Sequence, residues 1–170
     1  MGNHLIFMHI AAIGFGSNMG DRKASCREGL RLLAEDGRCR VTRVSRLYLT
    51  EPQDYADQDE FVNGAALVET ELAPAELLAL LKRIEAAVGR TPGGVRFGPR
   101  VLDMDILFYG EMALESPELV LPHPRMDKRR FVLMPLCDIM PDWTHPVSGK
   151  SARELLGALG ETGQKVTVMP

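Results

Sequence analysis

The segment Arg96-Phe-Gly-Pro-Arg-Val-Leu-Asp-Met-Asp-Ile-Leu-Phe-Tyr-Gly110 decides how the fold is interpreted, because it places two acidic residues inside an otherwise apolar run. From Val101 to Tyr109 the other residues are β-branched, aromatic or large and apolar, which predicts a buried strand. Alternate residues of a strand point to the same face, so Asp103 and Asp105 should lie close together. Burying two like charges is costly, and a divalent metal with oxygen ligands is the simplest compensation.

The acidic pair could also be stabilised without a metal. Each aspartate could pair with a nearby arginine, Arg96 or Arg100, or the strand could be shorter and leave both aspartates at its mouth. A lone Asp-x-Asp motif is short and common, so on its own it favours one of these arrangements over a metal site.

The composition is that of an ordinary globular protein. A length of 170 residues predicts one domain over residues 1–170. A formal net charge of −3, with both signs interspersed, argues against a nucleic-acid partner. The apolar N-terminal run is too short to span a bilayer, so we expect no membrane association. We expect a monomer. The odd, widely spaced cysteines Cys26, Cys39 and Cys137 fit neither a disulfide framework nor a zinc site and favour a cytoplasmic location.

The order of predicted elements indicates an α+β fold. Strand-forming residues bounded by turn signals predict strands at 5–15, 39–49, 61–70 and 101–109. Helical spacing and capping residues predict helices at 21–37, 74–88, 131–137 and 151–159. The order strand, helix, strand, strand, helix, strand predicts a ferredoxin-like βαββαβ core with an antiparallel sheet and additional C-terminal helices.

Several polar features lie outside these elements or on their surfaces. The loop at 50–60 is a candidate substrate wall or lid, and the arginine-bearing loop at 89–99 could close over a metal-bound polyphosphate. Asn63 is either a turn residue or an amide that reads a planar ligand. His123, between two prolines, is either a loop residue or a donor to phosphate. Lys82 and Glu85 are three residues apart on a helix and predict a surface ion pair.

The combined motif around the acidic pair resembles a known family. Arg96-Phe-Gly-Pro-Arg100 followed by Leu102-Asp-Met-Asp-Ile106 is similar to the signature of 6-hydroxymethyl-7,8-dihydropterin pyrophosphokinases. Further similarity lies at Gly16-Ser-Asn18, Thr50, Phe61-x-Asn63, Arg83-Ile-Glu85, Gly89-Arg90, Pro122-His123 and Arg129-x-Phe131. The resemblance implies a ferredoxin-like fold and an enzyme of folate biosynthesis. Such an enzyme transfers diphosphate from ATP to the pterin, giving AMP and the pterin diphosphate.

The resemblance also implies roles for individual residues. Asp103 and Asp105 would ligate two Mg²⁺ ions that hold ATP, the co-substrate, and orient the reduced pterin. The implied catalytic residues are Arg90, Arg100 and Asp105. The implied ATP contacts are Lys82, Glu85, Arg90, Arg100, Ile106, His123 and Arg129. The implied pterin contacts are Thr50, Gln53, Phe61, Asn63 and Phe131, with the two phenylalanines on either side of the ring and Asn63 reading its amide-like edge.

Two alternative functions share parts of this pattern. A two-metal phosphodiesterase or nuclease also uses closely spaced carboxylates, but the sequence lacks further acidic ligands and an extended basic face. A ferredoxin-like ligand-sensing module would not be catalytic. In that case Asp103→Ala should leave nucleotide affinity almost unchanged.

Overall fold

The computed structural model describes residues 8–52, 57–89, 101–161 and 163–170. The main sheet contains β1 (His9–Ser17), β2 (Cys39–Val44), β3 (Tyr48–Thr50), β4 (Phe61–Thr70), β5 (Asp103–Tyr109) and β8 (Val166–Val168). The helices are α1 (Arg22–Glu35), α2 (Pro74–Val88), α3 (Arg130–Ile139) and α4 (Ala152–Leu159). A small hairpin pairs β6 (Leu114–Glu115) with β7 (Val120–Leu121), and the 3₁₀ turn η1 (Met126–Lys128) precedes α3.

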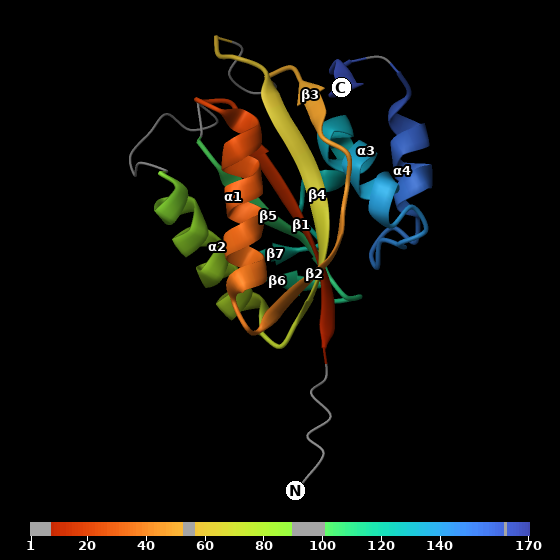
Figure 1. Ribbon diagram of the computed structural model, residues 1–170. Coiled ribbons are helices and arrows are strands. Elements are labelled where there is room, and N and C mark those ends of the chain that lie inside the picture. The colour runs from red at the N-terminus through yellow and green to blue at the C-terminus, as the bar shows by residue number, and fades with distance from the viewer. Residues whose placement is uncertain (1–7, 53–56, 90–100, 162) are drawn as a thin grey trace, which may run out of the picture.

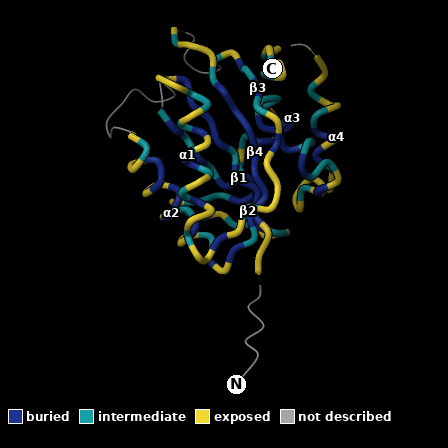
Figure 2. Tube along the Cα trace, in the orientation of Figure 1, coloured by how far each residue is buried: buried dark blue, intermediate teal, exposed yellow. Residues whose placement is uncertain are grey.

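The sheet is antiparallel and is covered by helices on both faces. Its strand order is β5-β1-β4-β3-β8, and β2 also pairs with β4. Helices α1 and α2 lie on one face, and α3 and α4 lie on the other (Figure 1). Buried residues therefore concentrate in the central strands (Figure 2), and nearly all of β4 is buried because each face of the sheet meets a helical layer. The predicted ferredoxin-like α+β fold is confirmed.

The second predicted strand, 39–49, is wrong as a single element. It is two strands, because β2 ends at Val44 and β3 begins at Tyr48. Between them, the backbone N–H of Ser45 donates to the carbonyl of Ala65 at 2.8 Å, and the Ser45 hydroxyl accepts from the Ala65 N–H at 2.9 Å. Pairing with β4 is thus interrupted by a side chain, and the chain changes direction before β3.

The predicted helix signals correspond to observed caps. The Asp21 side chain accepts from the Ala24 N–H at 3.1 Å and caps α1. Helix α2 begins at Pro74 and ends at Gly89, whose φ of 117° lies in the left-handed region that favours glycine. Ser151 caps α4 by accepting from the Glu154 N–H at 3.1 Å.

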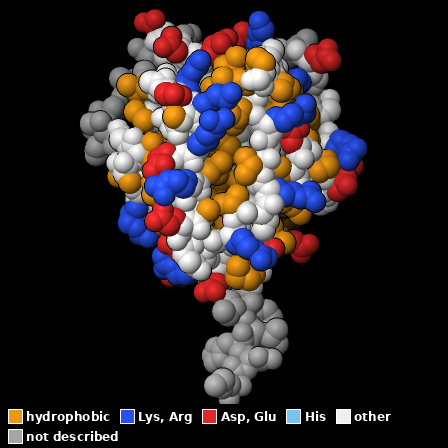
Figure 3. Space-filling model, in the orientation of Figure 1, with side chains coloured by type: hydrophobic (Ala, Val, Ile, Leu, Met, Phe, Trp, Pro, Cys, Tyr) orange, Lys and Arg blue, Asp and Glu red, His pale blue; other side chains and the backbone are white. Residues whose placement is uncertain are grey.

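Charged side chains of both signs are interspersed with hydrophobic ones on the face shown in Figure 3. Charged pairs among the described residues include Arg31 with Glu28 at 2.8 Å within α1, and Arg40 of β2 with Glu69 of β4. Exposed pairs of this kind contribute at most about 1 kcal/mol each. Among the described residues, no helix has the length and apolar character needed to cross a membrane.

A close approach between β1 and β4 gives a stability prediction. A Cβ added at Gly64 would lie 2.4 Å from the ring of Phe15, which is 3% exposed and cannot move aside. We expect Gly64→Ala to lower the free energy of unfolding by about 1–3 kcal/mol, because overpacking a filled core forces strain. Denaturant unfolding measures this. Gly157→Ala in α4 is the matched control, since its added Cβ meets nothing within 4 Å and alanine favours a helix. Equal stability of Gly64→Ala and wild type would contradict the expectation.

Candidate active site

The two aspartates of β5 lie on the face of the sheet that also carries α3 and α4. Asp103 is the first residue of β5, and both aspartates are half-buried. Directly opposite them on β1 are two glycines, because Asp103 pairs with Gly16 and Asp105 pairs with Gly14. Paired residues of an antiparallel sheet share a face, so β1 places no side chain beside either carboxylate. The strand is shorter than predicted and starts at the acidic pair.

The next strand continues this row with Asn63, which pairs with Gly16 across β1 and β4. Adjacent strands are about 4.8 Å apart, so Asp103 and Asn63 are separated by roughly 10 Å with only a glycine between them. A Cβ on Gly16 would lie 2.2 Å from the Asn63 Oδ1 atom. Gly16 thus leaves room for the Asn63 amide to lie over β1, toward the carboxylates of β5.

The amide of Asn63 is buried and held in place. Asn63 is 8% exposed, and its Nδ2 donates to the Thr50 Oγ1 at 2.6 Å. It lies inside β4, so the interpretation as a turn residue is excluded. Phe61, at the start of β4, pairs with Thr50 and lies on the same face as Asn63. These three predicted pterin contacts are adjacent, whereas Gln53 lies outside the described residues.

Glu85 supports the acidic pair from α2. It is 2% exposed, and its Oε1 accepts from the backbone N–H of Met104 at 2.8 Å, between the two aspartates. Lys82 Nζ is 3.3 Å from the same oxygen. The predicted ion pair of Lys82 with Glu85 is therefore present, but its location at the surface is wrong for Glu85, which is buried. The reason is that β5 is an edge strand of the main sheet, so its outward N–H needs an acceptor from the helix packed beside it.

The electrostatics of the aspartates fit a cation. Burial, the neighbouring charge of Asp103 and that of Glu85 raise the pKa of Asp105 to about 7, although Lys82 and Arg129 oppose the change. Among the described residues, the carboxylates of Asp103 and Glu85 thus act on Asp105 against the cations of Lys82 and Arg129. Within the described ranges, no cluster of three or more His, Cys, Asp or Glu residues could hold a metal alone. A divalent cation fits here if further ligands come from a bound phosphate or water.

The raised pKa predicts a pH dependence for the metal-free protein. Asp105 binds its proton more tightly when folded than at its ordinary pKa of 3.8, so its contribution to stability is present at low pH and lost as the pH rises toward about 7. In the presence of a chelator, we expect the free energy of unfolding to fall more steeply from pH 4 to pH 7 for wild type than for Asp105→Asn. Denaturant titrations across this range measure the two slopes. The difference in slope reports Asp105 together with its charged neighbours, and equal slopes would contradict the assignment.

His123 and Arg129 approach the same face from the segment after β7. The backbone N–H of His123 donates to the Leu107 carbonyl of β5 at 2.8 Å. The ring Nδ1 of His123 accepts from the backbone N–H of Arg125 at 3.2 Å. Nε2 therefore carries the ring proton. Burial, with Arg129 and Arg125 nearby, lowers the pKa of His123 to about 4, so the ring is a neutral donor at neutral pH. His123 also borders an open cavity of about 380 Å³ beside the β6–β7 hairpin.

Phe131 lies in the first turn of α3, next to this segment. The guanidinium of Arg129 lies 5.4 Å from the centre of the Phe131 ring. Phe131 is half-buried and packs against the core cluster that α3 and α4 form with the sheet. An aromatic side chain on α3 and one on β4 are thus both available on this side of the sheet.

Comparison with known proteins gives the family. Residues 12–141 match the family model of 7,8-dihydro-6-hydroxymethylpterin-pyrophosphokinase. The chain belongs to this pyrophosphokinase family. It is 46% identical to the 2-amino-4-hydroxy-6-hydroxymethyldihydropteridine pyrophosphokinase of Bacillus subtilis, over 77% of this chain and 78% of that protein. The corresponding protein of Pseudomonas aeruginosa is 42% identical over 86% of this chain and 89% of its own length.

Longer relatives contain the pyrophosphokinase segment as one part. The chain is 49% identical to the mitochondrial folate synthesis bifunctional protein of Arabidopsis thaliana. The match covers 78% of this chain but only 24% of that protein. A crystal structure of Plasmodium falciparum HPPK-DHPS with pterin and p-hydroxybenzoate matches with a TM-score of 0.70 at 18% identity. It covers 92% of this chain and 45% of that chain, and supports the fold.

The structure brings together some of the site residues predicted from the sequence, but not all of them. Asp103, Asp105, Asn63, Thr50 and Phe61 share one face of the sheet. The predicted catalytic and phosphate-binding arginines, Arg90 and Arg100, lie outside the described residues. The Ile106 side chain is 2% exposed and belongs to the core on the α1 and α2 side, so the predicted nucleotide contact would have to come from its backbone.

Two further contacts were not predicted. Asn18 is 3% exposed, and its Nδ2 donates to the Gln58 Oε1 at 2.9 Å and the Asp59 carbonyl at 3.2 Å, tying the loop before β4 to the end of β1. The glycine-rich turn around Asn18 was the available signal. Trp143 stacks on Phe108 of β5 with ring centres 4.4 Å apart, and nothing in its local sequence indicates that partner.

Proposed function

We propose that this chain transfers diphosphate from ATP to 6-hydroxymethyl-7,8-dihydropterin, giving AMP and the pterin diphosphate in folate biosynthesis. The observation that carries the proposal is the row Asp103, Gly16 and Asn63 across three strands. A phosphate-directed carboxylate pair and a ring-reading amide lie on one face without an intervening side chain. The names of the relatives that match along most of their length support this activity.

The phosphate side of the site is formed by β5 and the segment after β7. Asp103 and Asp105 would hold two Mg²⁺ ions, which neutralise phosphate charge as it develops during transfer. Glu85 keeps the intervening backbone in place, so both carboxylates stay directed to the same face. The neutral His123 ring donates its Nε2–H to a phosphate oxygen. Arg129 supplies positive charge beside it, and Lys82 is a further nucleotide contact on α2.

The pterin side of the site is formed by β3, β4 and α3. The Asn63 side chain presents a donor and an acceptor, which matches the amide-like edge of a pterin. Phe61 and Phe131 would lie on the two faces of the flat ring, a use that suits aromatic side chains. Thr50 orients the Asn63 amide through the 2.6 Å hydrogen bond. Gln53, Arg90 and Arg100 stay predicted contacts.

This arrangement acts mainly by positioning. The transferred group needs its attacking and leaving oxygens in line, and fixed donors and cations neutralise its charge. Holding ATP beside β5 and the pterin beside β4 places the hydroxymethyl oxygen near the β-phosphorus. We also propose that the protein is a cytoplasmic monomer. We expect no nucleic-acid partner, because charges of both signs are interspersed on the face shown in Figure 3.

The deciding assay supplies Mg-ATP and 6-hydroxymethyl-7,8-dihydropterin and separates the products by chromatography. AMP and the pterin diphosphate should appear in equal amounts, and no AMP should form without pterin. ADP as the product, or no turnover in folded protein, would contradict the proposal. Release of nucleotides from single-stranded DNA or RNA by the same preparation would instead support the phosphodiesterase alternative.

A further inference from the structure

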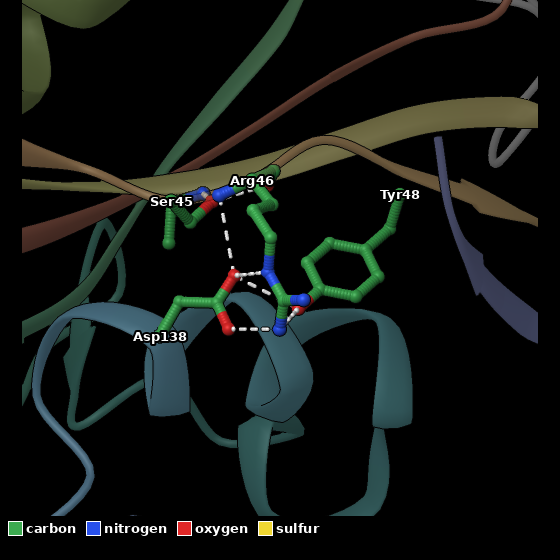
Figure 4. A network of polar contacts seen from close by, with 5 residues as sticks. Ser45, Arg46, Tyr48 and Asp138 are labelled. Atoms are coloured by element: carbon green, nitrogen blue, oxygen red, sulfur yellow. Dashed lines mark hydrogen bonds and ion pairs between the residues drawn. The ribbon is translucent and has the colours of Figure 1, made fainter. Parts of the chain in front are cut away.

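A cluster of three side chains joins the C-terminal end of α3 to the segment between β2 and β3 (Figure 4). The Asp138 Oδ1 accepts from Arg46 Nη2 at 2.8 Å. The Asp138 Oδ2 accepts from the Tyr48 hydroxyl at 2.8 Å, and from the Arg46 side-chain Nε and backbone N–H at 3.2 Å each. One carboxylate thus receives four donors from two residues of the sheet layer.

The hydrogen bonds of this cluster are directional, because their acceptor is an ionised carboxylate. Burial alone would raise the pKa of Asp138, but hydrogen bonds from Arg46 and Tyr48 outweigh it and leave the pKa lowered. Burial and the Asp138 carboxylate raise the pKa of Tyr48 to about 12, so the hydroxyl remains a donor. Hydrogen bonds to an ionised carboxylate are short and geometrically demanding. The nearby Arg43 Nη1 donates to the Ile139 carbonyl at 3.0 Å and ties the same helix end.

Both ends of the cluster lead to the proposed pterin site. In the sheet, Tyr48 pairs with Asn63, and Thr50, two residues later, pairs with Phe61. On the helix, Asp138 follows Phe131 by seven residues, which is two turns or about 10 Å along the axis. Residues at this spacing share a helix face. The cluster therefore connects the strand that borders one aromatic side chain to the helix that carries the other.

Hydrophobic packing alone does not fix the position of α3 along the sheet. Leu133, Leu136 and Ile139 bury α3 against the sheet. Burial of apolar area is non-directional, so by itself it does not select one position of the helix along its axis. The hydrogen bonds to Asp138 add a directional restraint to that of the Arg43 bond, because a small shift of the helix breaks several of them together.

We propose that Asp138, Arg46 and Tyr48 are positioning residues that set the spacing of Phe61 and Phe131 for the pterin ring. The inference rests on the proposed pyrophosphokinase function. It assigns no catalytic contact to the three residues. Their effect acts through the two aromatic side chains and so falls on pterin binding rather than on nucleotide binding.

The test measures two dissociation constants in each variant. Pterin binding is followed by ligand fluorescence, and binding of a non-hydrolysable Mg-ATP analogue by calorimetry. We expect Asp138→Ala to weaken pterin binding about tenfold, and Tyr48→Phe, which removes one hydrogen bond, about threefold. Asp138→Asn should fall between wild type and Asp138→Ala, because its amide oxygen still accepts from Tyr48. The nucleotide dissociation constant should stay within about twofold of wild type in all three.

Two controls separate positioning from loss of stability. Glu69→Gln weakens the Arg40–Glu69 pair between β2 and β4, away from α3, and should leave both dissociation constants unchanged. Val68→Ala removes buried apolar atoms on the opposite face of β4 and should lower stability without weakening pterin binding. If Val68→Ala weakens pterin binding as much as Asp138→Ala does, the positioning role is overturned.

Further outcomes distinguish this inference from the proposed function. Normal pterin affinity in folded Asp138→Ala and Tyr48→Phe, with wild-type turnover intact, would overturn the positioning role and leave the function standing. Wild-type protein that binds pterin but forms no AMP would remove the function, while the affinities of the variants would still decide the positioning role. If Asp138→Ala does not fold, Tyr48→Phe decides, because it retains every atom except one hydroxyl oxygen.

Discussion

Replacing Asp105 with asparagine is expected to lower turnover by about a thousandfold while the protein stays folded. In the proposed mechanism the carboxylate supplies the negative charge that would hold a metal at the phosphate site, and asparagine has nearly the same shape without that charge. Folding should survive because the carboxylate is held beside Asp103 and its pKa is raised to about 7, so removing the charge relieves repulsion. Steady-state AMP formation and thermal unfolding, measured on the same preparation, give the two results.

The control for this variant is Asp142→Asn. Asp142 pairs with Arg153 at 3.2 Å, its side chain is 87% exposed, and it belongs to the loop before α4. The same chemical change there should leave turnover within about twofold of wild type, as is usual for exposed pairs. Asp103→Asn should behave like Asp105→Asn. Near-normal rates in both β5 variants would remove the metal assignment.

Asn63→Leu is expected to raise the KM for the pterin by about a hundredfold, with little change in the affinity for nucleotide. A site that reads a ligand by hydrogen bonds loses much of its affinity when the reading group is replaced by an apolar one of similar size. Thr50→Val is the companion variant, because it removes the partner of the amide at 2.6 Å but leaves the amide itself. We expect its effect to be smaller and in the same direction.

Steady-state titration of pterin at saturating Mg-ATP measures both variants. Because Asn63 is 8% exposed, thermal unfolding must accompany the kinetics to separate affinity from stability. A pterin KM close to wild type in folded Asn63→Leu would exclude Asn63 as the group that reads the ring.

Local signals predicted a large part of the fold. The strand at 61–70 and the helix at 74–88 have the predicted bounds, because alternation, a first-turn proline and a terminal glycine act within a few residues. The break at 45–47 and the strand β8 were not predicted. Both depend on which distant strand lies alongside, as the Ser45 contact with Ala65 shows, and local patterns carry little information about that.

In the candidate site, too, local patterns predicted some features, while others depend on tertiary structure. The two-residue period of a strand placed Asp103 and Asp105 on one face without knowledge of the fold. The row that joins Asp103 to Asn63 through Gly16 depends on the register of three strands, which the sequence does not reveal. The burial of Glu85 depends on the face that α2 turns toward β5. The roles of all these residues in catalysis stay predictions until the variants are measured.

The short strand β8 has a consequence for solubility. It pairs with the outer edge of β3, and flanking bonds from Met169 to Leu47 at 2.8 Å and from Glu51 to Lys165 at 3.2 Å extend the contact. An uncovered strand edge offers its backbone groups to another chain and promotes aggregation. Strand β8 covers this edge with the short run Val166–Val168. The edge of β3 that borders the proposed pterin site is therefore where self-association would begin if these residues detached.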